Sequence, residues 1–234
     1  VGGNALDANT TATNNTAVGY LALTSTQTGA SNTAVGRSAL ANNTAGDNTA
    51  VGASAMLVNT TGTRNVAVGA NALDANTDGN DVTAIGYLAL SANTANSNVG
   101  VGSSALGVNT SGTSNVSVGT GSLASNTTAN NNTALGTNAL NQNTTGANNT
   151  TVGSGSMNAN TTGNSNAALG LQSLSSNTTG GDNAGFGYLS LRDTTTGSDN
   201  TACGANALRA NTTGGDNTAV GKGALLANTT GSQN

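Results

Sequence analysis

The sequence predicts an all-β protein: a parallel β-solenoid or β-roll of about fourteen 17-residue repeats, assembled as a trimeric fibre. Three observations support this prediction. A repeat runs along the whole chain, most copies contain a short β-branched segment that ends at a glycine, and a polar stretch such as Asn-Thr-Thr-Gly follows. A short fixed period is typical of architectures in which each unit contacts mainly its neighbours. We therefore expect a single repeat array over residues 1–234, without a domain boundary.

The repeat is clearest from Asn132 to Asn148, NTALGTNALNQNTTGAN, and its positions are numbered here with Asn132 as position 1. Every full repeat begins with Asn except one that begins with Val82, and the step is seventeen residues, or sixteen where a loop residue is missing. Full copies run from Asn15, after an incomplete copy in residues 1–14. Because the chain shows no atypical capping repeat, we expect it to be an excerpt of a longer array.

The start of each repeat predicts a short strand. Position 2 is Thr or Val in eleven of thirteen copies, position 4 is apolar in every copy, and position 5 is always Gly. β-branched residues favour strands, and glycine weakens or ends them. Alternation places positions 2 and 4 on one face of the strand, and we expect the position 4 side chains to line the core. These candidate core residues include Val18, Val35, Leu135 and Val220.

A second strand is predicted at positions 7 to 11. Position 9 is Leu in every copy except for two Met residues, and position 8 is always Ala or Ser. We expect the position 9 side chain to point inward, which makes core residues of Leu23, Leu40, Leu140 and Leu225. A helix is less favoured because glycine recurs and the apolar spacing never sustains a helical period.

Positions 12 to 15 read NTTG or a close variant of it, which predicts a turn. Asn tolerates left-handed backbone, and Gly adopts positive φ without steric cost. Asn occupies position 12 in twelve copies, so stacked repeats would align the side-chain amides in a ladder. The representative turn and ladder residues are Asn143, Gly146, Asn160 and Gly163.

Two large apolar side chains in seventeen residues make a thin core. Their burial offsets only part of the conformational entropy that seventeen ordered residues lose. Several chains that share one core would supply further burial, so we expect a homo-oligomer, with a trimer as the favoured state.

Two segments carry a resemblance to known families: NTAVGRSAL, from Asn32 to Leu40, and NTAVGKGAL, from Asn217 to Leu225. They resemble the repeats in head domains of trimeric autotransporter adhesins, and more closely the Asn-Thr-Gly repeats of tail-fibre-like proteins of bacteria and phages. The resemblance implies the shaft or stalk of an extracellular, cell-surface or virion appendage that supports attachment. Its partners would be further copies of the chain, with a host-surface glycan or protein at a tip outside this chain as a second option.

Composition argues against several function classes. The chain has nine acidic residues, all Asp, five scattered basic residues and no His, so we expect no nucleic-acid binding, which needs clustered Lys and Arg. Without His or Glu, Cys203 lacks the usual base partners, so we expect no catalytic residues, no cofactor and no enzyme activity. The expected role of Cys203 is that of a small buried apolar residue. No apolar run is long enough to span a membrane.

The predicted turns carry two kinds of candidate site, Asp residues for a metal and Asn sequons for a glycan. Asp ends some repeats, at Asp47, Asp81, Asp182, Asp199 and Asp216, but calcium needs six to eight oxygen ligands. Solvated turn carboxylates are therefore the favoured interpretation, with no metal site. Glycosylation sequons begin at nine Asn residues of the predicted turns. The candidate acceptors include Asn59, Asn143, Asn160 and Asn177.

Ice binding is the alternative function. Thr occupies position 13 in thirteen of fourteen copies and recurs at position 2, so a flat β-face would present regularly spaced hydroxyl and methyl groups to a water lattice. Sugar adhesion is a third option, through ring stacking on Tyr20, Tyr87 and Tyr188, which all lie at position 6. Surface variation without a role is the simpler interpretation of these tyrosines.

Overall fold

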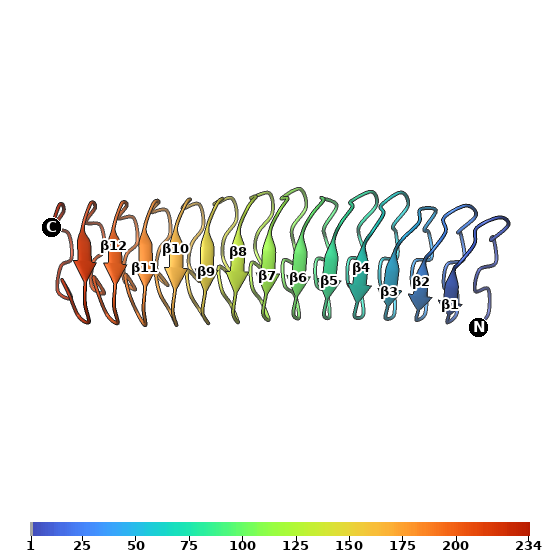
Figure 1. Cartoon of the computed structure of the whole chain (residues 1–234), viewed down its shortest axis with the longest axis horizontal. Coiled ribbons are helices and arrows are strands. Elements are labelled where there is room, and N and C mark those ends of the chain that lie inside the picture. The colour runs from blue at the N-terminus through green and yellow to red at the C-terminus, as the bar shows by residue number, and fades with distance from the viewer. Residues whose placement is uncertain (1) are drawn as a thin grey trace. The chain divides into compact units, whose positions relative to one another are not determined.

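The computed structural model describes residues 2–234, and within them it contains one three-residue strand per full repeat and no helix. Val1, which the repeat places at position 4, lies outside the described residues. The chain divides into two compact units, Val1–Asn115 and Val116–Asn234. Each unit is a parallel β-solenoid (Figure 1).

The strands of the first unit are β1 (Thr16–Val18), β2 (Thr33–Val35), β3 (Thr49–Val51), β4 (Val66–Val68), β5 (Thr83–Ile85) and β6 (Val99–Val101). The strands of the second unit are β7 (Val116–Val118), β8 (Thr133–Leu135), β9 (Thr150–Val152), β10 (Ala167–Leu169), β11 (Ala184–Phe186), β12 (Thr201–Cys203) and β13 (Thr218–Val220).

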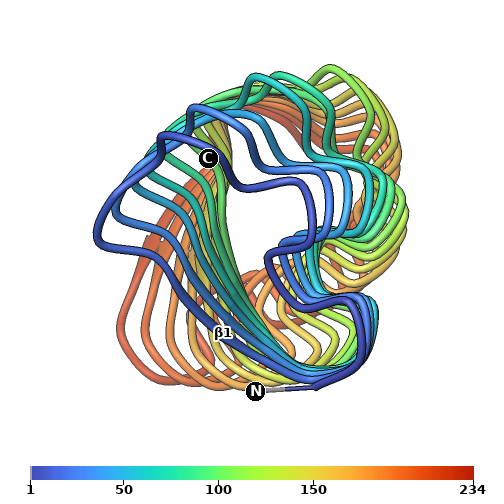
Figure 2. The same ribbon diagram turned by 90° about the vertical axis from the view of Figure 1, so that its right-hand side faces the viewer.

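Within each unit, consecutive strands pair in parallel with the same repeat position aligned. In the first unit Thr33 of β2 aligns with Thr49 of β3, although a sixteen-residue repeat separates them. In the second unit Ala134 of β8 aligns with Thr151 of β9. Each repeat therefore forms one turn of the solenoid, called a rung below, and each repeat position forms a column of side chains. Figure 2 shows consecutive rungs following the same path. The predicted parallel β-solenoid is confirmed.

Within the described residues, the largest fully buried side chains are the Leu and Met residues at position 9. Leu23, Leu40 and Leu140 are fully buried, together with the small residues at positions 3 and 8. Leu225 differs from the prediction, because it is 38% exposed. It lies in the last rung of the described chain, where no following rung covers it.

The apolar side chains at position 4 point out of the solenoid, so the prediction that they form the core is wrong. Val18 is 45% exposed, Val35 36%, Leu135 37% and Val220 72%. The strands alternate as expected, but the buried residue is the small one at position 3. A Cβ atom added at Gly100, which occupies position 3, would lie 3.0 Å from the side chain of Leu90. The interior is thus narrow beside the position 9 side chain, and position 3 holds only Ala, Gly, Ser or, at Thr151, Thr.

Positions 7 to 11 form turns, so the second predicted strand is also absent from the described residues. Asn138 and Leu140 both have a φ of 53°, a left-handed conformation that breaks the alternation of a strand. Because the alternation is broken, the neighbours Ala139 and Leu140 are both fully buried. Consecutive rungs remain hydrogen-bonded here, since the N–H of Leu140 donates to the carbonyl of Ser156 at 3.0 Å.

Candidate functional site

A column of buried asparagines at position 12 closes the polar turn. Nδ2 of Asn160 donates to Oδ1 of Asn143 at 2.8 Å and to the carbonyl of Gly163 at 3.0 Å. In the preceding rung, Nδ2 of Asn143 donates to the carbonyl of Gly146 at 2.8 Å. The structure thus contains the predicted amide ladder, and in these rungs the amide also fixes the glycine at position 15.

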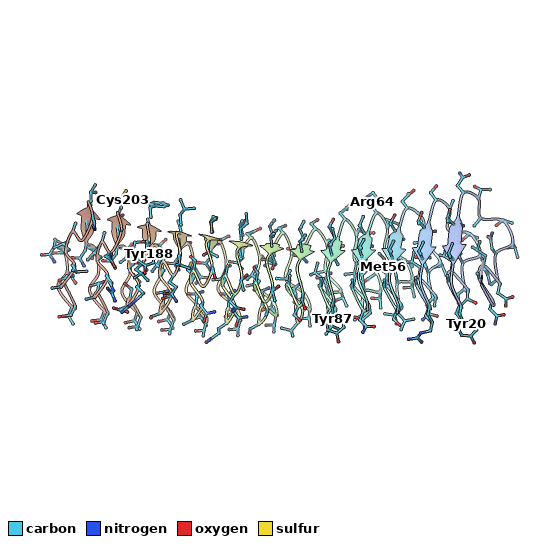
Figure 3. All side chains as sticks on the ribbon, turned by 90° about the horizontal axis from the view of Figure 1, so that it is seen from below. Tyr20, Met56, Arg64, Tyr87, Tyr188 and Cys203 are labelled. Carbon is cyan, nitrogen blue, oxygen red and sulfur yellow. The ribbon has the colours of Figure 1, made fainter. Side chains whose placement is uncertain are left out.

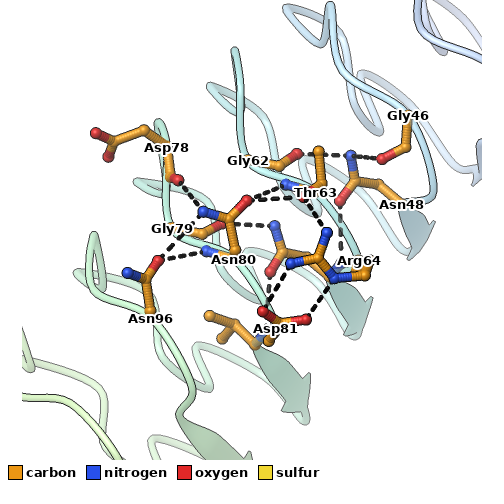
Figure 4. Close-up of polar contacts among 12 residues, drawn as sticks. Gly46, Asn48, Gly62, Thr63, Arg64, Asp78, Gly79, Asn80, Asp81 and Asn96 are labelled. Atoms are coloured by element: carbon orange, nitrogen blue, oxygen red, sulfur yellow. Dashed lines mark hydrogen bonds and ion pairs between the residues drawn. The ribbon is translucent and has the colours of Figure 1, made fainter.

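Position 1 forms a second asparagine column, which the sequence reasoning treated only as the start of the repeat. The backbone N–H of Asn149 donates to Oδ1 of Asn132 at 3.0 Å, and Nδ2 of Asn149 donates to the carbonyl of Gly163 at 2.9 Å. Figure 4 shows the same pattern in the first unit, where Nδ2 of Asn48 donates to the carbonyl of Gly62 at 2.8 Å. Burying an amide is costly unless its hydrogen bonds are satisfied. The near-invariance of Asn at position 1 is the sequence signal that indicates this buried column.

The four proposed glycan acceptors do not fit glycosylation. Asn59, Asn143, Asn160 and Asn177 are fully buried. Each Nδ2 donates both to the ladder and to a turn carbonyl, for example from Asn177 to Oδ1 of Asn160 and to Gly180. A glycan linked to Nδ2 would replace one of these hydrogens and would need space that the interior lacks. The prediction of glycan acceptors at these four sites is wrong.

Thr194 interrupts the position 12 ladder of the second unit. Within the described residues, Oδ1 of Asn177 and Oγ1 of Thr194 are buried without a hydrogen-bond partner. We expect the substitution Thr194→Asn to raise the free energy of unfolding by about 1 kcal/mol, because the new amide can donate to Asn177. Urea denaturation of both proteins measures the gain. Thr26→Asn is the matched control, since Oγ1 of Thr26 already donates to the carbonyl of Asn43 at 2.8 Å. An equal gain in unfolding free energy for both variants would show that the unpaired Oδ1 of Asn177 is not its cause.

The threonine column at position 13 belongs to the turn and does not form a free hydroxyl array. Oγ1 of Thr161 donates to the carbonyl of Thr178, and Oγ1 of Thr178 donates to that of Thr195, both at 3.0 Å. These hydroxyls link consecutive rungs. Of the two threonine columns considered for ice binding, the one at position 13 is therefore accounted for by intrachain hydrogen bonds.

The outward face of the sheet, defined here as positions 2 and 4 of the strands, is a regular surface of each unit. No charged residue occupies either position. The position 4 column consists of Val18, Val35, Val51, Val68, Ile85 and Val101 in the first unit, and of Val118, Leu135, Val152, Leu169, Phe186, Cys203 and Val220 in the second. Cys203 is exposed on this face (Figure 3), so the expectation that it is buried is wrong. Contiguous exposed apolar side chains mark interaction sites.

Charged groups are few and lie at the turns. Arg64 donates to both oxygens of Asp81 in the next rung, at 2.6 and 2.8 Å (Figure 4). This hydrogen-bonded pair lowers the pKa of the Asp81 carboxyl and raises the pKa of Arg64. No group of three or more His, Cys, Asp or Glu residues that could hold a metal ion occurs in the described part of the chain.

The three tyrosines at position 6 are exposed. Tyr20, Tyr87 and Tyr188 are each more than half exposed. A search of residues 2–234 for helices that are long and apolar enough to cross a membrane finds none.

The sequence matches no protein-family model, and neither a curated protein nor a solved structure matches it. The fold and the columns of identical side chains define the class of the protein, which is a β-solenoid repeat protein.

Proposed function

We propose that this protein is the shaft of an extracellular or virion-borne fibre, in which copies of the chain associate through the outward face of the sheet. The observation that carries the proposal is the exposed apolar column at position 4, which includes Val35 and Leu135. A shaft that supports attachment needs rigidity, and the hydrogen bonds between consecutive rungs within each unit contribute to it.

The column favours another copy of the chain as its partner. Its side chains recur once per rung in both units, so a partner that covers them all must have the same period. A second copy meets this condition without further assumptions. The face carries no charge that would oppose association of identical surfaces, and burial of its apolar area would stabilise the assembly by about 25 cal/mol per Å².

Three copies are the favoured number. In a closed cyclic arrangement with the outward faces turned toward a common axis, each face contacts two others and is covered on both sides of the position 4 column. The resemblance to trimeric adhesin and tail-fibre repeats supports the same number. The thin interior, with one large apolar side chain per rung, explains why a shared apolar layer would matter for stability.

Oligomeric mass in solution tests the proposal. Light scattering of the unmodified protein is expected to give three times the chain mass of 22.2 kDa. The double variant Val118→Lys with Leu135→Lys is expected to dissociate, because association would bury two unpaired ammonium groups. The control variant Thr137→Lys with Ser154→Lys adds the same charge at the exposed position 6 column and should keep the assembled mass. A monomeric unmodified protein, or assembly that survives the first variant, would overturn the proposal.

Cys203 gives a second measurement on the same samples. It is exposed on the outward face of the single chain, so association through that face would cover it. The thiol should react slowly with a maleimide in the assembled protein and quickly in the dissociated variant. Equal rates would show that another surface holds the copies together.

Ice binding is the second candidate, and one observation favours it. Thr16, Thr33 and Thr49 occupy position 2 in consecutive strands with aligned register, so their side chains form a regular outward row beside the valines. Neighbouring strands in a sheet lie about 4.8 Å apart. The row is interrupted at Val66, Val99, Val116, Ala167 and Ala184. This function needs a free outward face, so a monomer with measurable thermal hysteresis would support it, whereas an assembled protein that freezes normally would exclude it.

A further inference from the structure

We propose that a hollow on the side of the second unit binds a neutral saccharide. The hollow has a volume of about 400 Å³ and spans three rungs, a size within the range of small-ligand sites. It is formed by positions 6, 7 and 10 of the repeat, whereas the assembly proposed above uses positions 2 and 4. The two proposals therefore rest on different surfaces and fail independently.

A missing side chain creates the hollow. Position 7 is Asn138 in one rung, Gly155 in the next and Gln172 in the third, all in left-handed backbone with φ between 53° and 62°. A Cβ atom added at Gly155 would have no neighbour within 4 Å except Cγ of Gln172, at 3.5 Å. The gap in this column is thus open space between two amide side chains.

Uncharged hydrogen-bonding groups line the hollow. Nδ2 of Asn158 donates to the backbone carbonyl of Asn138 at 3.1 Å, which fixes this amide and leaves its Oδ1 as an acceptor. The side chains of Ser154, Gln172 and Ser175 make no hydrogen bond to other described residues. Amides and hydroxyls both donate and accept hydrogen bonds, as sugar hydroxyls do. No lining residue is charged, so the chemistry selects a neutral sugar over an acidic one.

An apolar wall adjoins these polar groups. Leu171, at position 6, lines the hollow and is 48% exposed. Tyr188, 51% exposed, holds position 6 of the following rung (Figure 3), and the two rungs are joined by the N–H of Leu189, which donates to the carbonyl of Leu171 at 3.1 Å. A pyranose ring has a face of C–H groups that packs on such a leucine and an aromatic ring. Arg192, near Tyr188, is paired through two hydrogen bonds with Asp193, so its charge is compensated.

Titration of the full chain with maltotriose, lactose, chitotriose and the acidic sugar sialyllactose tests the site. We expect at least one neutral probe to bind with a dissociation constant on the order of 1 mM, and sialyllactose to bind no more tightly. Gly155→Gln fills the gap with the side chain that Gln172 already holds at a similar left-handed φ, and it should weaken binding about tenfold or more. Gly223→Gln is the matched control, because Gly223 has the same repeat position, a φ of 68° and no neighbour within 4 Å.

A second variant tests the apolar wall. Tyr188→Ala should weaken binding about fivefold, whereas Tyr20→Ala, at the same repeat position in the first unit, should leave it unchanged. Absence of binding by all three neutral probes at about 50 mM, no effect of Gly155→Gln, or preference for sialyllactose would each overturn the proposal. Light scattering of the same samples shows whether a variant has altered assembly, which separates failure of this site from failure of the fibre proposal.

Discussion

The substitution Gly136→Ala is expected to lower the free energy of unfolding of the second unit by more than about 3 kcal/mol. Gly136 occupies position 5, where φ is 136°, a conformation that L-residues rarely adopt. An added Cβ would lie 2.6 Å from the carbonyl oxygen of Gly153 in the next rung. That carbonyl cannot move away freely, because both rungs are held by short backbone hydrogen bonds, such as the one from Gly153 to Leu135 at 2.8 Å.

Gly221→Ala separates the clash from the backbone strain. Gly221 has the same repeat position and a φ of 119°, but an added Cβ would meet nothing within 4 Å. Only conformational strain then remains, with an expected cost of about 1 kcal/mol. Urea denaturation followed by circular dichroism compares the two variants with the unmodified protein. Equal losses of unfolding free energy in the two variants would mean that the close approach of glycines in adjacent rungs is not what excludes a side chain at position 5.

The second large effect is expected from Leu140→Ala, which should cost about 2 to 5 kcal/mol. Leu140 is fully buried, and so are Leu123 and Met157 in the adjacent rungs of the same column. The interior contains no other large apolar side chain in that rung, so its neighbours cannot close the cavity without breaking the hydrogen bonds between rungs. Thermal and urea unfolding both measure the loss.

Leu171→Ala is the control for this prediction, since Leu171 is 48% exposed. The substitution should lower the free energy of unfolding by no more than about 0.5 kcal/mol. Because Leu171 lies off the outward face, the variant should assemble as the unmodified protein does. Leu140→Met offers a second comparison, with an expected cost below about 1.5 kcal/mol, because Met56 and Met157 already occupy position 9 in other rungs. Similar losses for Leu140→Ala and Leu171→Ala would show that position 9 is not the core.

Much of the local structure was readable from the repeat. The constant glycine at position 5 follows a strand in every full repeat, as at Gly136 after β8, and the asparagines at position 12 form the expected ladder. These features depend on interactions between identical positions of adjacent rungs, and a fixed period aligns such positions whatever the detailed path of the chain. The saccharide hollow was not foreseen, because it depends on one glycine, Gly155, between two longer side chains.

The outward face could not be derived in the same way. Alternation requires that positions 2 and 4 share a face, but it does not say which face is inside. The more apolar face is the expected inner face, and this expectation fails for Leu135 because the interior is limited by its width. The left-handed residues at positions 7 and 9 bury Ala139 and Leu140 together and leave room at position 3 only for a small side chain.

By itself, the sequence determined the rung, its parallel register and its asparagine ladder, since each follows from repetition of one short unit. Only the tertiary structure decided which side of the strand is buried, that the ladder amides are inaccessible, and that an apolar column remains exposed. The physical reason is that burial depends on the cross-section enclosed by one complete turn of the chain. That cross-section is set by the left-handed turns opposite the strand, whose conformation the pattern of apolar residues does not reveal.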